Sequence, residues 1–253
     1  MPAFTAPLLE VRRETPRTRV LTIPVDRLFT FDAGQAILLG AHGRERRPYS
    51  IASSPELAHE TGTIQVLVSV DAAGDPGSHL PQPRPGTLVD LEGPTGAFVI
   101  PASVPYAHVL FVAGGTGIAP LRAMADHLLR TSASAQMALL YSARSHDEFA
   151  FIDELRAYAA GRRLELHQTV TRDDSVAWIG GRGRIGQSHF EAVLHDPANT
   201  LCFVCGPPAL VSESVATLRA LGVPSELVRI ETWERRALTP DPDSRPPLLT
   251  PDS

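Results

Sequence analysis

The 253-residue sequence predicts two domains, an antiparallel β domain followed by an α/β domain with a doubly wound parallel sheet. In the first hundred residues, short apolar or alternating segments are separated by Gly, Pro and Asp turn signals, which is typical of an antiparallel barrel or sandwich. From Tyr106 onward, near-continuous apolar strands alternate with helical segments, as in a doubly wound parallel sheet. We place the boundary in Pro101 to Pro105, which gives domains at residues 1–102 and 103–233 and an extension at 234–253.

Each element is assigned from its hydrophobic pattern. No long helix is expected in the first domain, and the loop-rich segment Asp71–Pro85 is where a short one would fit. The extension is proline-rich without periodicity, so it is either disordered or an extended arm. The first domain is expected to contain strands at Arg19–Ile23, Ala36–Leu39, Tyr49–Ala52, Thr63–Val70 and Leu88–Leu91. The second is expected to contain strands at His108–Ala113, Met137–Tyr141, Leu164–Thr171, Leu201–Cys205 and Val228–Trp233, and helices at Leu121–Arg130, Phe149–Ala159, Gln187–Leu194 and Ala209–Leu221.

Composition and charge exclude several classes of protein. A hydrophobic content of 43% with 20% charged residues fits a globular protein rather than a disordered or fibrous one. The formal net charge of -5 argues against a dedicated nucleic-acid binder, which usually has a basic excess. The apolar runs are too short to cross a bilayer, and the N-terminal segment does not resemble a signal peptide. We therefore expect a cytoplasmic protein.

The two cysteines, Cys202 and Cys205, have a CxxC spacing that is found in some redox pairs. Here both lie in an apolar run that is predicted to be a buried strand, where residues three apart point to opposite faces. A disulfide or a shared metal is therefore not expected. Two thiols also cannot supply the four ligands of an iron–sulfur cluster, so no metal site is predicted.

Three short motifs stand in a fixed order along the chain: Arg47–Ser50, Gly114–Pro120 and Cys205–Pro207. The first places a guanidinium, an aromatic ring and a hydroxyl within four residues of a strand. The second lies where an apolar strand meets a helix, at which backbone N–H groups can receive a phosphate. The third ends another parallel strand, on the edge of the sheet where ligands of open α/β folds bind.

In this order and spacing the motifs resemble those of the ferredoxin–NADP reductase-like flavoprotein family, whose members bind a flavin in one domain and a nicotinamide nucleotide in the next. Phe31–Gln35 resembles the family's turn before the flavin strand, and Ser53 and Ser54 follow that strand as the family pattern expects. Gly93–Phe98 matches the signature that closes the barrel. The resemblance extends to Trp233 and implies an antiparallel β-barrel flavin-binding domain followed by an α/β nucleotide-binding domain.

The resemblance implies roles for the residues of the flavin domain. Arg47 would hold phosphate oxygens, Tyr49 would stack on the isoalloxazine, and Ser50 would hydrogen-bond the flavin at its redox centre. Pro48 would leave one side of the strand without a pairing partner. A second phosphate contact is expected from Gly77 and Ser78, with His79 as an exposed loop residue. FAD is preferred over FMN as the flavin.

The glycine-rich turn departs from the usual GxGxxG pattern, but it has the family's Gly-Gly-Thr-Gly-x-x-Pro form, with Pro120 suited to a first helical turn. The resemblance implies that this turn lines the nucleotide pyrophosphate site and that the Cys-Gly-Pro motif places its cysteine beside the nicotinamide and flavin N5. We expect Cys205 to be a positioning residue, the alternative being a buried structural cysteine. The residues assigned to these two motifs are Gly115, Thr116, Gly117, Cys205, Gly206 and Pro207.

Several arginines follow the second and third strands of the α/β domain, where an additional 2′-phosphate would be bound. This pattern resembles the NADPH-using bacterial members of the family, although NADH-using reductases can carry similar arginines. Asp147 and Glu148 lie nearby, so NADPH is preferred and NADH stays possible. The candidate residues are Arg144, Arg172, Arg182 and Arg184.

The last predicted strand ends in Glu231-Thr-Trp233, similar to the Glu-x-aromatic ending of many family members. The resemblance places Trp233 over the isoalloxazine and Glu231 close to the active centre. The alternative for Trp233 is a strand residue in the core.

The sequence therefore predicts an FAD-dependent oxidoreductase that passes hydride from NADPH to the flavin and then single electrons to a ferredoxin or flavodoxin. Ser50, Cys205 and Glu231 are the candidate catalytic residues. Arg44, Arg46, Arg12 and Arg13 are candidate contacts for an acidic carrier protein. The alternatives are an NADH-dependent reductase component of an oxygenase system and a non-catalytic flavin-binding electron-transfer subunit.

Overall fold

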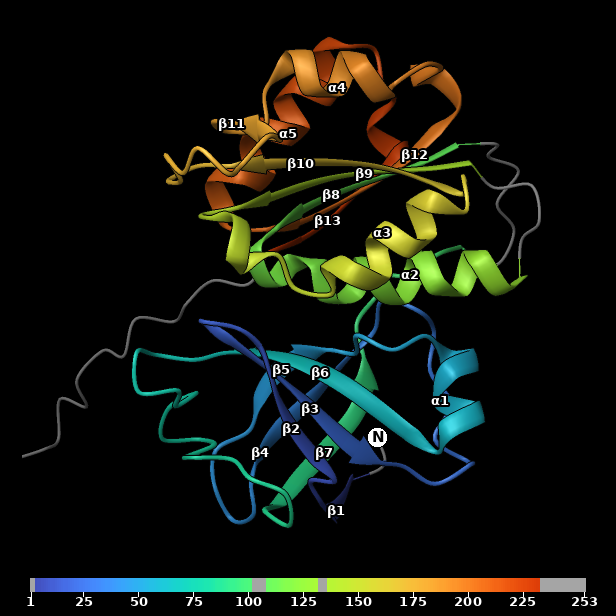
Figure 1. Cartoon of the computed structure of the whole chain (residues 1–253). Coiled ribbons are helices and arrows are strands. Elements are labelled where there is room, and N and C mark those ends of the chain that lie inside the picture. The colour runs from blue at the N-terminus through green and yellow to red at the C-terminus, as the bar shows by residue number, and fades with distance from the viewer. Residues whose placement is uncertain (1–2, 102–107, 132–135, 233–253) are drawn as a thin grey trace, which may run out of the picture.

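The computed structural model describes residues 3–101, 108–131 and 136–232, arranged as a β domain beneath an α/β domain (Figure 1). In the upper domain, helices cover both faces of a parallel sheet, one face toward the β domain and the other away from it. The boundary predicted at Pro101 to Pro105 falls largely on residues outside these ranges, as do Trp233 and the extension at 234–253.

The β domain is built from two antiparallel sheets, with strand orders β1-β7-β4-β5 and β2-β3-β6. A bridge between Ile51 and Val66 links the end of β5 to β6, and apolar side chains of both sheets share one core. The predicted antiparallel barrel is therefore confirmed. Its elements are β1 (Ala3–Pro7), β2 (Glu10–Thr15), β3 (Thr18–Pro24), β4 (Ala36–Ala41), β5 (Arg47–Ser50), α1 (Pro55–Thr61), β6 (Thr63–Ser69) and β7 (Leu88–Thr95).

Three elements of this domain differ from the sequence prediction. Strands β1 and β2 were not predicted, because β2 is a mostly polar strand with little apolar alternation. Helix α1 was also missed, although its capping signals are present: the Ser54 side chain accepts from Leu57 N–H, and Gly62 ends the helix with a positive φ of 67°. The segment Asp71–Pro85 forms turns and contains no helix.

The α/β domain contains a six-stranded, fully parallel sheet in the order β11-β10-β9-β8-β12-β13. This doubly wound arrangement confirms the prediction, apart from the two-residue strand β11, which was too short to be recognised. Its strands are β8 (His108–Gly114), β9 (Gln136–Ala143), β10 (Leu164–Val170), β11 (Gly181–Arg182), β12 (Thr200–Gly206) and β13 (Val228–Thr232). Its helices are α2 (Ile118–Thr131), α3 (Ile152–Ala160), α4 (Gln187–Val193) and α5 (Pro208–Ala220), with short 3-10 turns at Gly115–Gly117, His146–Glu148, Pro197–Asn199 and Ser225–Leu227.

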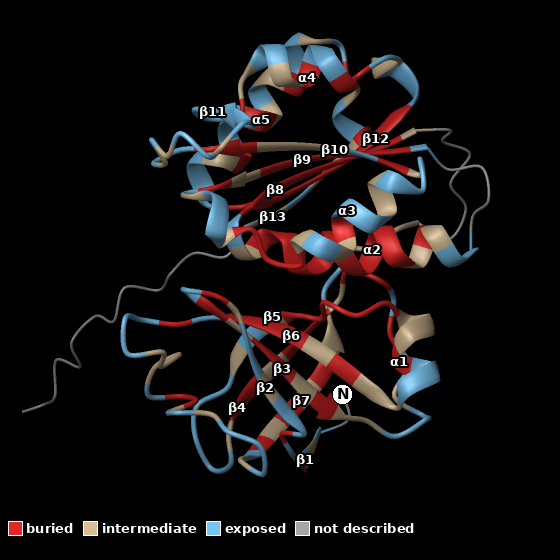
Figure 2. Cartoon of the chain, in the orientation of Figure 1, coloured by how far each residue is buried: buried red, intermediate tan, exposed pale blue. Residues whose placement is uncertain are grey.

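Burial is greatest in the central strands and in α2, which lies between the sheet and the β domain (Figure 2). Cys205 belongs to the core on the α2 side of the sheet, whereas Cys202 belongs to the core on the α5 side. Both cysteines are buried and free, so the prediction that their thiols face apart is confirmed. Among the described residues, no helix is long and apolar enough to cross a membrane.

Candidate active site

The first predicted motif forms β5, which stands at the end of its sheet and pairs there with β4. Pro48 is exposed, as expected for a strand whose other side lacks a ladder partner in this sheet. Ser50, the last residue of β5, is only 7% exposed. The strand therefore directs its final side chain away from solvent and toward the α/β domain.

Ser50, Glu231 and Cys205 meet at the junction of the two domains. The Ser50 hydroxyl donates to Glu231 Oε2 at 3.0 Å, and Cys205 Sγ lies 3.8 Å from the same oxygen. Glu231 and Cys205 are paired positions on the neighbouring strands β13 and β12. Three residues far apart in the sequence, all predicted as catalytic candidates, thus share one point of contact.

Burial, assisted by the negative charge of Glu231, raises the pKa of the Cys205 thiol well above its ordinary value. A protonated thiol is a poor nucleophile. The geometry therefore fits a positioning residue better than a residue that forms a covalent bond to substrate.

The glycine-rich turn and the Cys-Gly-Pro motif pack directly against each other. A Cβ placed on Gly117 would lie 2.2 Å from the backbone oxygen of Cys205, so only glycine fits there. A Cβ on Gly114 would meet Pro207 Cδ at 2.8 Å. The close approach of the two motifs aligns the ends of β8 and β12 at one edge of the sheet, where open α/β folds bind ligands.

The same turn presents an open backbone on its outer side. Gly115 is exposed, has a φ of +55°, and has no atom within 4 Å of the place where a Cβ would stand. Its carbonyl accepts from the hydroxyl of Tyr141 in β9 at 3.2 Å, and this hydrogen bond holds the turn against the sheet. Helix α2 starts directly after it, with Pro120 as its third residue. A positively polarised helix start behind an unobstructed glycine turn fits a phosphate group.

The four predicted arginines differ in how their guanidinium groups are engaged. Arg144 and Arg172 are exposed, lie beside each other through the Arg172 N–H to Arg144 carbonyl bond of 2.8 Å, and have no side-chain partner among the described residues. Arg182 instead donates to the backbone carbonyls of Asp173, Ser175 and Trp178, which ties down its own loop. Arg184 forms an exposed ion pair of 3.5 Å with Glu213.

In the loop predicted to contact the diphosphate, Gly77 has a positive φ of 113°. The N–H of Gly77 is already used, because it donates to Asp75 Oδ1 at 2.8 Å, whereas Ser78 is exposed. Arg47 is half-buried and lies 3.5 Å from Glu45. Of the predicted contacts for the diphosphate, Arg47 and Ser78 are the two that this arrangement leaves most accessible.

The prediction that His79 is an exposed loop residue is wrong. Its side chain is only 2% exposed, and its Nε2 lies 2.6 Å from the hydroxyl of Tyr49. Burial raises the pKa of Tyr49 to about 12, so the phenol stays protonated at neutral pH. The sequence around His79, with Ser78 before it and Leu80 after it, contains no pattern that predicts the contact of this loop with β5.

The supporting motifs of the barrel also converge. Gln35 donates from Nε2 to the Gly96 carbonyl at 3.2 Å, and a Cβ on Gly34 would lie 2.3 Å from Met124 Cε of α2. Phe98 packs edge-on against Phe203 of β12, with ring centroids 5.5 Å apart. The turns that were recognised around the flavin motif therefore hold the barrel against the sheet as well.

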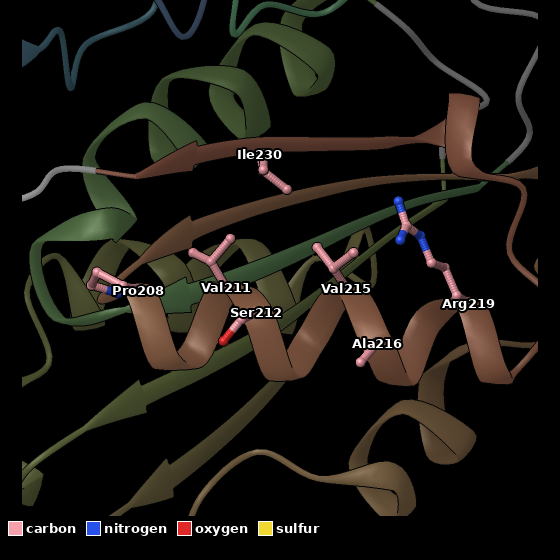
Figure 3. Close-up of a pocket in the computed structure, with 7 residues that line it drawn as sticks. All are labelled: Pro208, Val211, Ser212, Val215, Ala216, Arg219 and Ile230. Carbon is pink, nitrogen blue, oxygen red and sulfur yellow. The ribbon is translucent and has the colours of Figure 1, made fainter.

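A hollow in the surface lies elsewhere, between α5 and β13, and contains none of the predicted site residues (Figure 3). It is mainly apolar, with the half-exposed Ile230 pointing into it. The core residue Val211 places it on the α5 side of the sheet, opposite Cys205. Its lining residues are Pro208, Val211, Ser212, Val215, Ala216, Arg219 and Ile230.

Comparison with known proteins gives matches for both domains. Residues 6–100 match the oxidoreductase FAD-binding domain family, and residues 111–215 match the oxidoreductase NAD-binding domain family. The first range contains the motif Arg47–Ser50, and the second contains Gly114–Pro120 and Cys205–Pro207.

Among curated relatives, the chain is 33% identical to "Ferredoxin--NADP reductase B" of Sorangium cellulosum over 245 residues, covering 91% of this chain and 98% of the relative. It is 31% identical to an "NADPH oxidoreductase" of Mycobacterium tuberculosis over 87% of its own length, and it spans 57% of that protein. A solved ferredoxin NADP+ reductase from Neisseria gonorrhoeae, with bound FAD and NADP, has the same fold (TM-score 0.77, 21% identity, covering 92% of this chain and 99% of that chain). The chain therefore belongs to the ferredoxin–NADP reductase family of FAD- and NAD-binding oxidoreductases.

Proposed function

We propose that this oxidoreductase oxidises NADPH through FAD and delivers single electrons to a ferredoxin or flavodoxin. The observation that carries the proposal is the contact of Ser50 from the barrel with Glu231 and Cys205 from the parallel sheet. The residues expected beside the flavin and those expected beside the nicotinamide meet at this point. We propose domain limits of 1–102 and 103–233, with an extension at 234–253, supported by the matched ranges 6–100 and 111–215.

FAD, when bound, supplies the acceptance of hydride and the release of single electrons. At the junction, the protein's own side chains orient the reacting rings of the two cofactors and hold a proton. Ser50 Oγ and Glu231 Oε2 form a hydrogen-bonded pair along which a proton can move between the buried junction and the edge of the sheet. The buried, protonated thiol of Cys205 lies 3.8 Å from that oxygen and borders it.

The nucleotide is proposed to bind along the carboxyl edge of the sheet. The turn Gly115–Gly117 receives the pyrophosphate on open backbone, and Gly206 and Pro207 form the opposite wall. The guanidinium groups of Arg144 and Arg172 have no partner within the described part of the chain, and they are the proposed contacts of the 2′-phosphate, which favours NADPH over NADH. Arg182 and Arg184 take a smaller part because their guanidinium groups have other partners.

The flavin is proposed to lie against β5. Tyr49 contributes the aromatic face, Ser50 the hydroxyl at the redox centre, and Arg47 with Ser78 the contacts to the diphosphate. Pro48 keeps this strand at the edge of its sheet, and Gly77 shapes the phosphate turn through its positive φ. Trp233 lies outside the described residues, and its proposed position over the isoalloxazine follows from the family resemblance.

The protein partner is proposed from the family rather than from a defined surface. Of the arginines considered for an acidic carrier, Arg12 is paired with Glu14, Arg46 lies 3.2 Å from Glu92, and Arg44 donates to a backbone carbonyl. Carboxylates therefore compensate the charges of Arg12 and Arg46, whereas Arg44 keeps its charge. The cytoplasmic location also stays a prediction from the sequence.

The proposal is tested with the purified FAD-containing protein under anaerobic conditions. NADPH is expected to reduce the flavin faster than NADH at equal concentration, and added ferredoxin or flavodoxin is expected to restore the oxidised flavin spectrum. Equal or faster reduction by NADH would favour a reductase component of an oxygenase system. Failure of both nucleotides to reduce the bound flavin would favour the non-catalytic electron-transfer subunit.

A further inference from the structure

The imidazole of His79 lies at the hydroxyl end of the Tyr49 ring, and the two ring planes are nearly parallel. The tyrosine hydroxyl and the histidine Nε2 are 2.6 Å apart, while the two ring centroids are 5.9 Å apart and the ring planes differ by 15°. A hydrogen bond to an imidazole nitrogen lies close to the plane of that ring. Nearly parallel planes joined by such a bond therefore continue each other, and the imidazole extends the phenol at its hydroxyl end.

His79 is held firmly at its backbone as well as at its side chain. Its carbonyl accepts from the Ala41 N–H at the end of β4 at 2.8 Å, and its imidazole reaches the neighbouring strand β5. The side chain is 2% exposed. His79 thus clamps the tip of Tyr49 from a loop that is anchored to the adjacent strand.

The protonation states of the pair follow from their surroundings. Burial, and then the positive charge of Arg47, lower the pKa of His79, while Glu45 and Asp75 act weakly in the opposite direction. The imidazole is therefore neutral at neutral pH, and the protonated phenol of Tyr49 donates to Nε2. In this tautomer Nδ1 carries the hydrogen atom.

That Nδ1 atom is buried and has no hydrogen-bond partner among the described residues. An unpaired buried polar atom destabilises a fold, and native proteins rarely retain one without a function that compensates. An apolar side chain of similar size at this position would avoid the penalty. The hydrogen bond to Tyr49 is therefore the contact that distinguishes histidine from an apolar side chain at this position.

We propose that His79 is a positioning residue, which fixes the ring of Tyr49 in the orientation that receives the flavin and thereby raises the affinity for FAD. This inference rests on the proposed contact between Tyr49 and the flavin. A tyrosine fixed at both ends does not lose ring freedom when the cofactor binds, so less entropy opposes binding. The effect is on the affinity and environment of the cofactor, and His79 takes no part in hydride transfer.

The test compares FAD binding and apoprotein stability in four variants: His79→Leu, His79→Gln, Tyr49→Phe and the double variant His79→Leu/Tyr49→Phe. FAD is removed, and its dissociation constant is measured by the quenching of flavin fluorescence, while the melting temperature is measured on the apoprotein. We expect His79→Leu and Tyr49→Phe each to weaken FAD binding about fivefold, the change that one neutral hydrogen bond supports. The double variant should bind no more weakly than either single variant, and His79→Gln, which retains an acceptor for the phenol, should bind nearly as the wild type does.

The apoprotein distinguishes positioning from a general structural role. His79→Leu removes the unpaired Nδ1 but leaves the Tyr49 hydroxyl without its acceptor, so its apoprotein should melt near the wild-type temperature while binding FAD more weakly. The double variant removes both polar atoms, and its apoprotein should melt at the wild-type temperature or above. The matched control His127→Leu removes a histidine hydrogen bond to Glu56 and should leave FAD binding unchanged. Additive losses in the double variant, or a loss of apoprotein stability that parallels the loss of affinity, would overturn the proposal.

A further variant separates this inference from the proposed function on which it rests. If Tyr49→Ala weakens FAD binding strongly but His79→Leu does not, the flavin contact stands and the positioning role of His79 is wrong. If Tyr49→Ala binds FAD as the wild type does, Tyr49 is not the flavin contact, and both statements fail.

Discussion

The two domains touch in two regions that are built on different principles. Around α2 the interface is closed: Arg122, 6% exposed, donates to Glu154, to the Ala52 carbonyl and to Gln65, and its guanidinium lies 4.3 Å above the centre of the Phe151 ring. At the carboxyl edge of the sheet the interface is open, with an exposed glycine turn and two arginines that lack side-chain partners among the described residues. The first region fixes the domains, and the second leaves groups available for ligands.

A second network strengthens the closed region. Ser54 caps α1 and donates to Asp126 at 2.5 Å, and Asp126 also accepts from Arg130 at 3.0 Å. In the open region, the Ser50 hydroxyl donates to Glu231 across the two domains. The closed region holds the domains together through buried side chains, whereas the open region leaves side chains available for ligands. Substitution of a side chain in the closed region should therefore affect mainly stability, and substitution of an exposed side chain in the open region should affect mainly ligand binding.

The largest expected effect is on stability, from the closed region. Arg122→Met removes a donor from Glu154, from the Ala52 carbonyl and from Gln65 and breaks a largely buried ion pair, which should lower the free energy of unfolding by on the order of 3 kcal/mol. Urea unfolding measures the change. The control Arg156→Met removes an exposed arginine paired with Asp153 at 3.9 Å and should stay within about 0.5 kcal/mol of wild type. Equal stability of the two variants would contradict the importance of the closed region.

Gly117→Ala should be the most damaging change in the open region. Its Cβ would lie 2.2 Å from the Cys205 carbonyl oxygen, so the two strand ends must separate, at a cost of about 2 to 3 kcal/mol in unfolding free energy. Gly115→Ala is the matched control, because its surroundings are open and the cost is confined to its left-handed φ, about 1 kcal/mol. Thermal unfolding of both variants checks the order. A Gly117→Ala protein as stable as Gly115→Ala would show that the two motifs are not in contact.

The arginines test the open region by affinity rather than stability. Arg144→Ala and Arg172→Ala should each raise KM for NADPH about tenfold, since each removes a charge-assisted contact, with little change for NADH. Arg184→Ala should have a smaller effect because Arg184 is already paired with Glu213. Steady-state kinetics with both nucleotides measure the ratio. Similar changes for NADPH and NADH would place the 2′-phosphate elsewhere.

The smallest expected effect is a pH dependence of stability that originates at His79. The pKa of His79 in the folded protein is lowered from its ordinary 6.5, so the stability it contributes is complete above that pH and is lost as the pH falls through the folded value. When the pH is lowered from about 7.5 to 5.5, the melting temperature of the wild type should therefore fall further than that of His79→Gln. Parallel pH profiles would contradict a neutral, buried imidazole.

Much of the fold follows from local patterns in the sequence. The continuous apolar runs of β8 and β12 predict parallel strands without tertiary information. The glycine turn before α2 is the basis of the proposed phosphate site. By contrast, β2 is nearly all polar, and α1 is seven residues long, so neither gives a clear periodic signal.

The missed parts of the candidate site depend on contacts between distant residues. The burial of His79 arises from its hydrogen bond to Tyr49, thirty residues away, and the loop sequence carries no periodic signal for it. Arg182 is chemically suited to a phosphate, yet its guanidinium stabilises the loop at Asp173 to Trp178. Residue type predicts what a side chain is able to bind, whereas its engagement by the backbone decides whether it is available.

The central claim is that the cofactors meet where Ser50 contacts Glu231. It is tested most directly by anaerobic stopped-flow reduction of the bound flavin by NADPH in wild-type, Ser50→Ala and Glu231→Gln proteins. Both variants are expected to retain FAD and to fold normally, but their flavin should be reduced about tenfold to a hundredfold more slowly than that of the wild type. Reduction of both variants at the wild-type rate would show that hydride transfer takes place elsewhere.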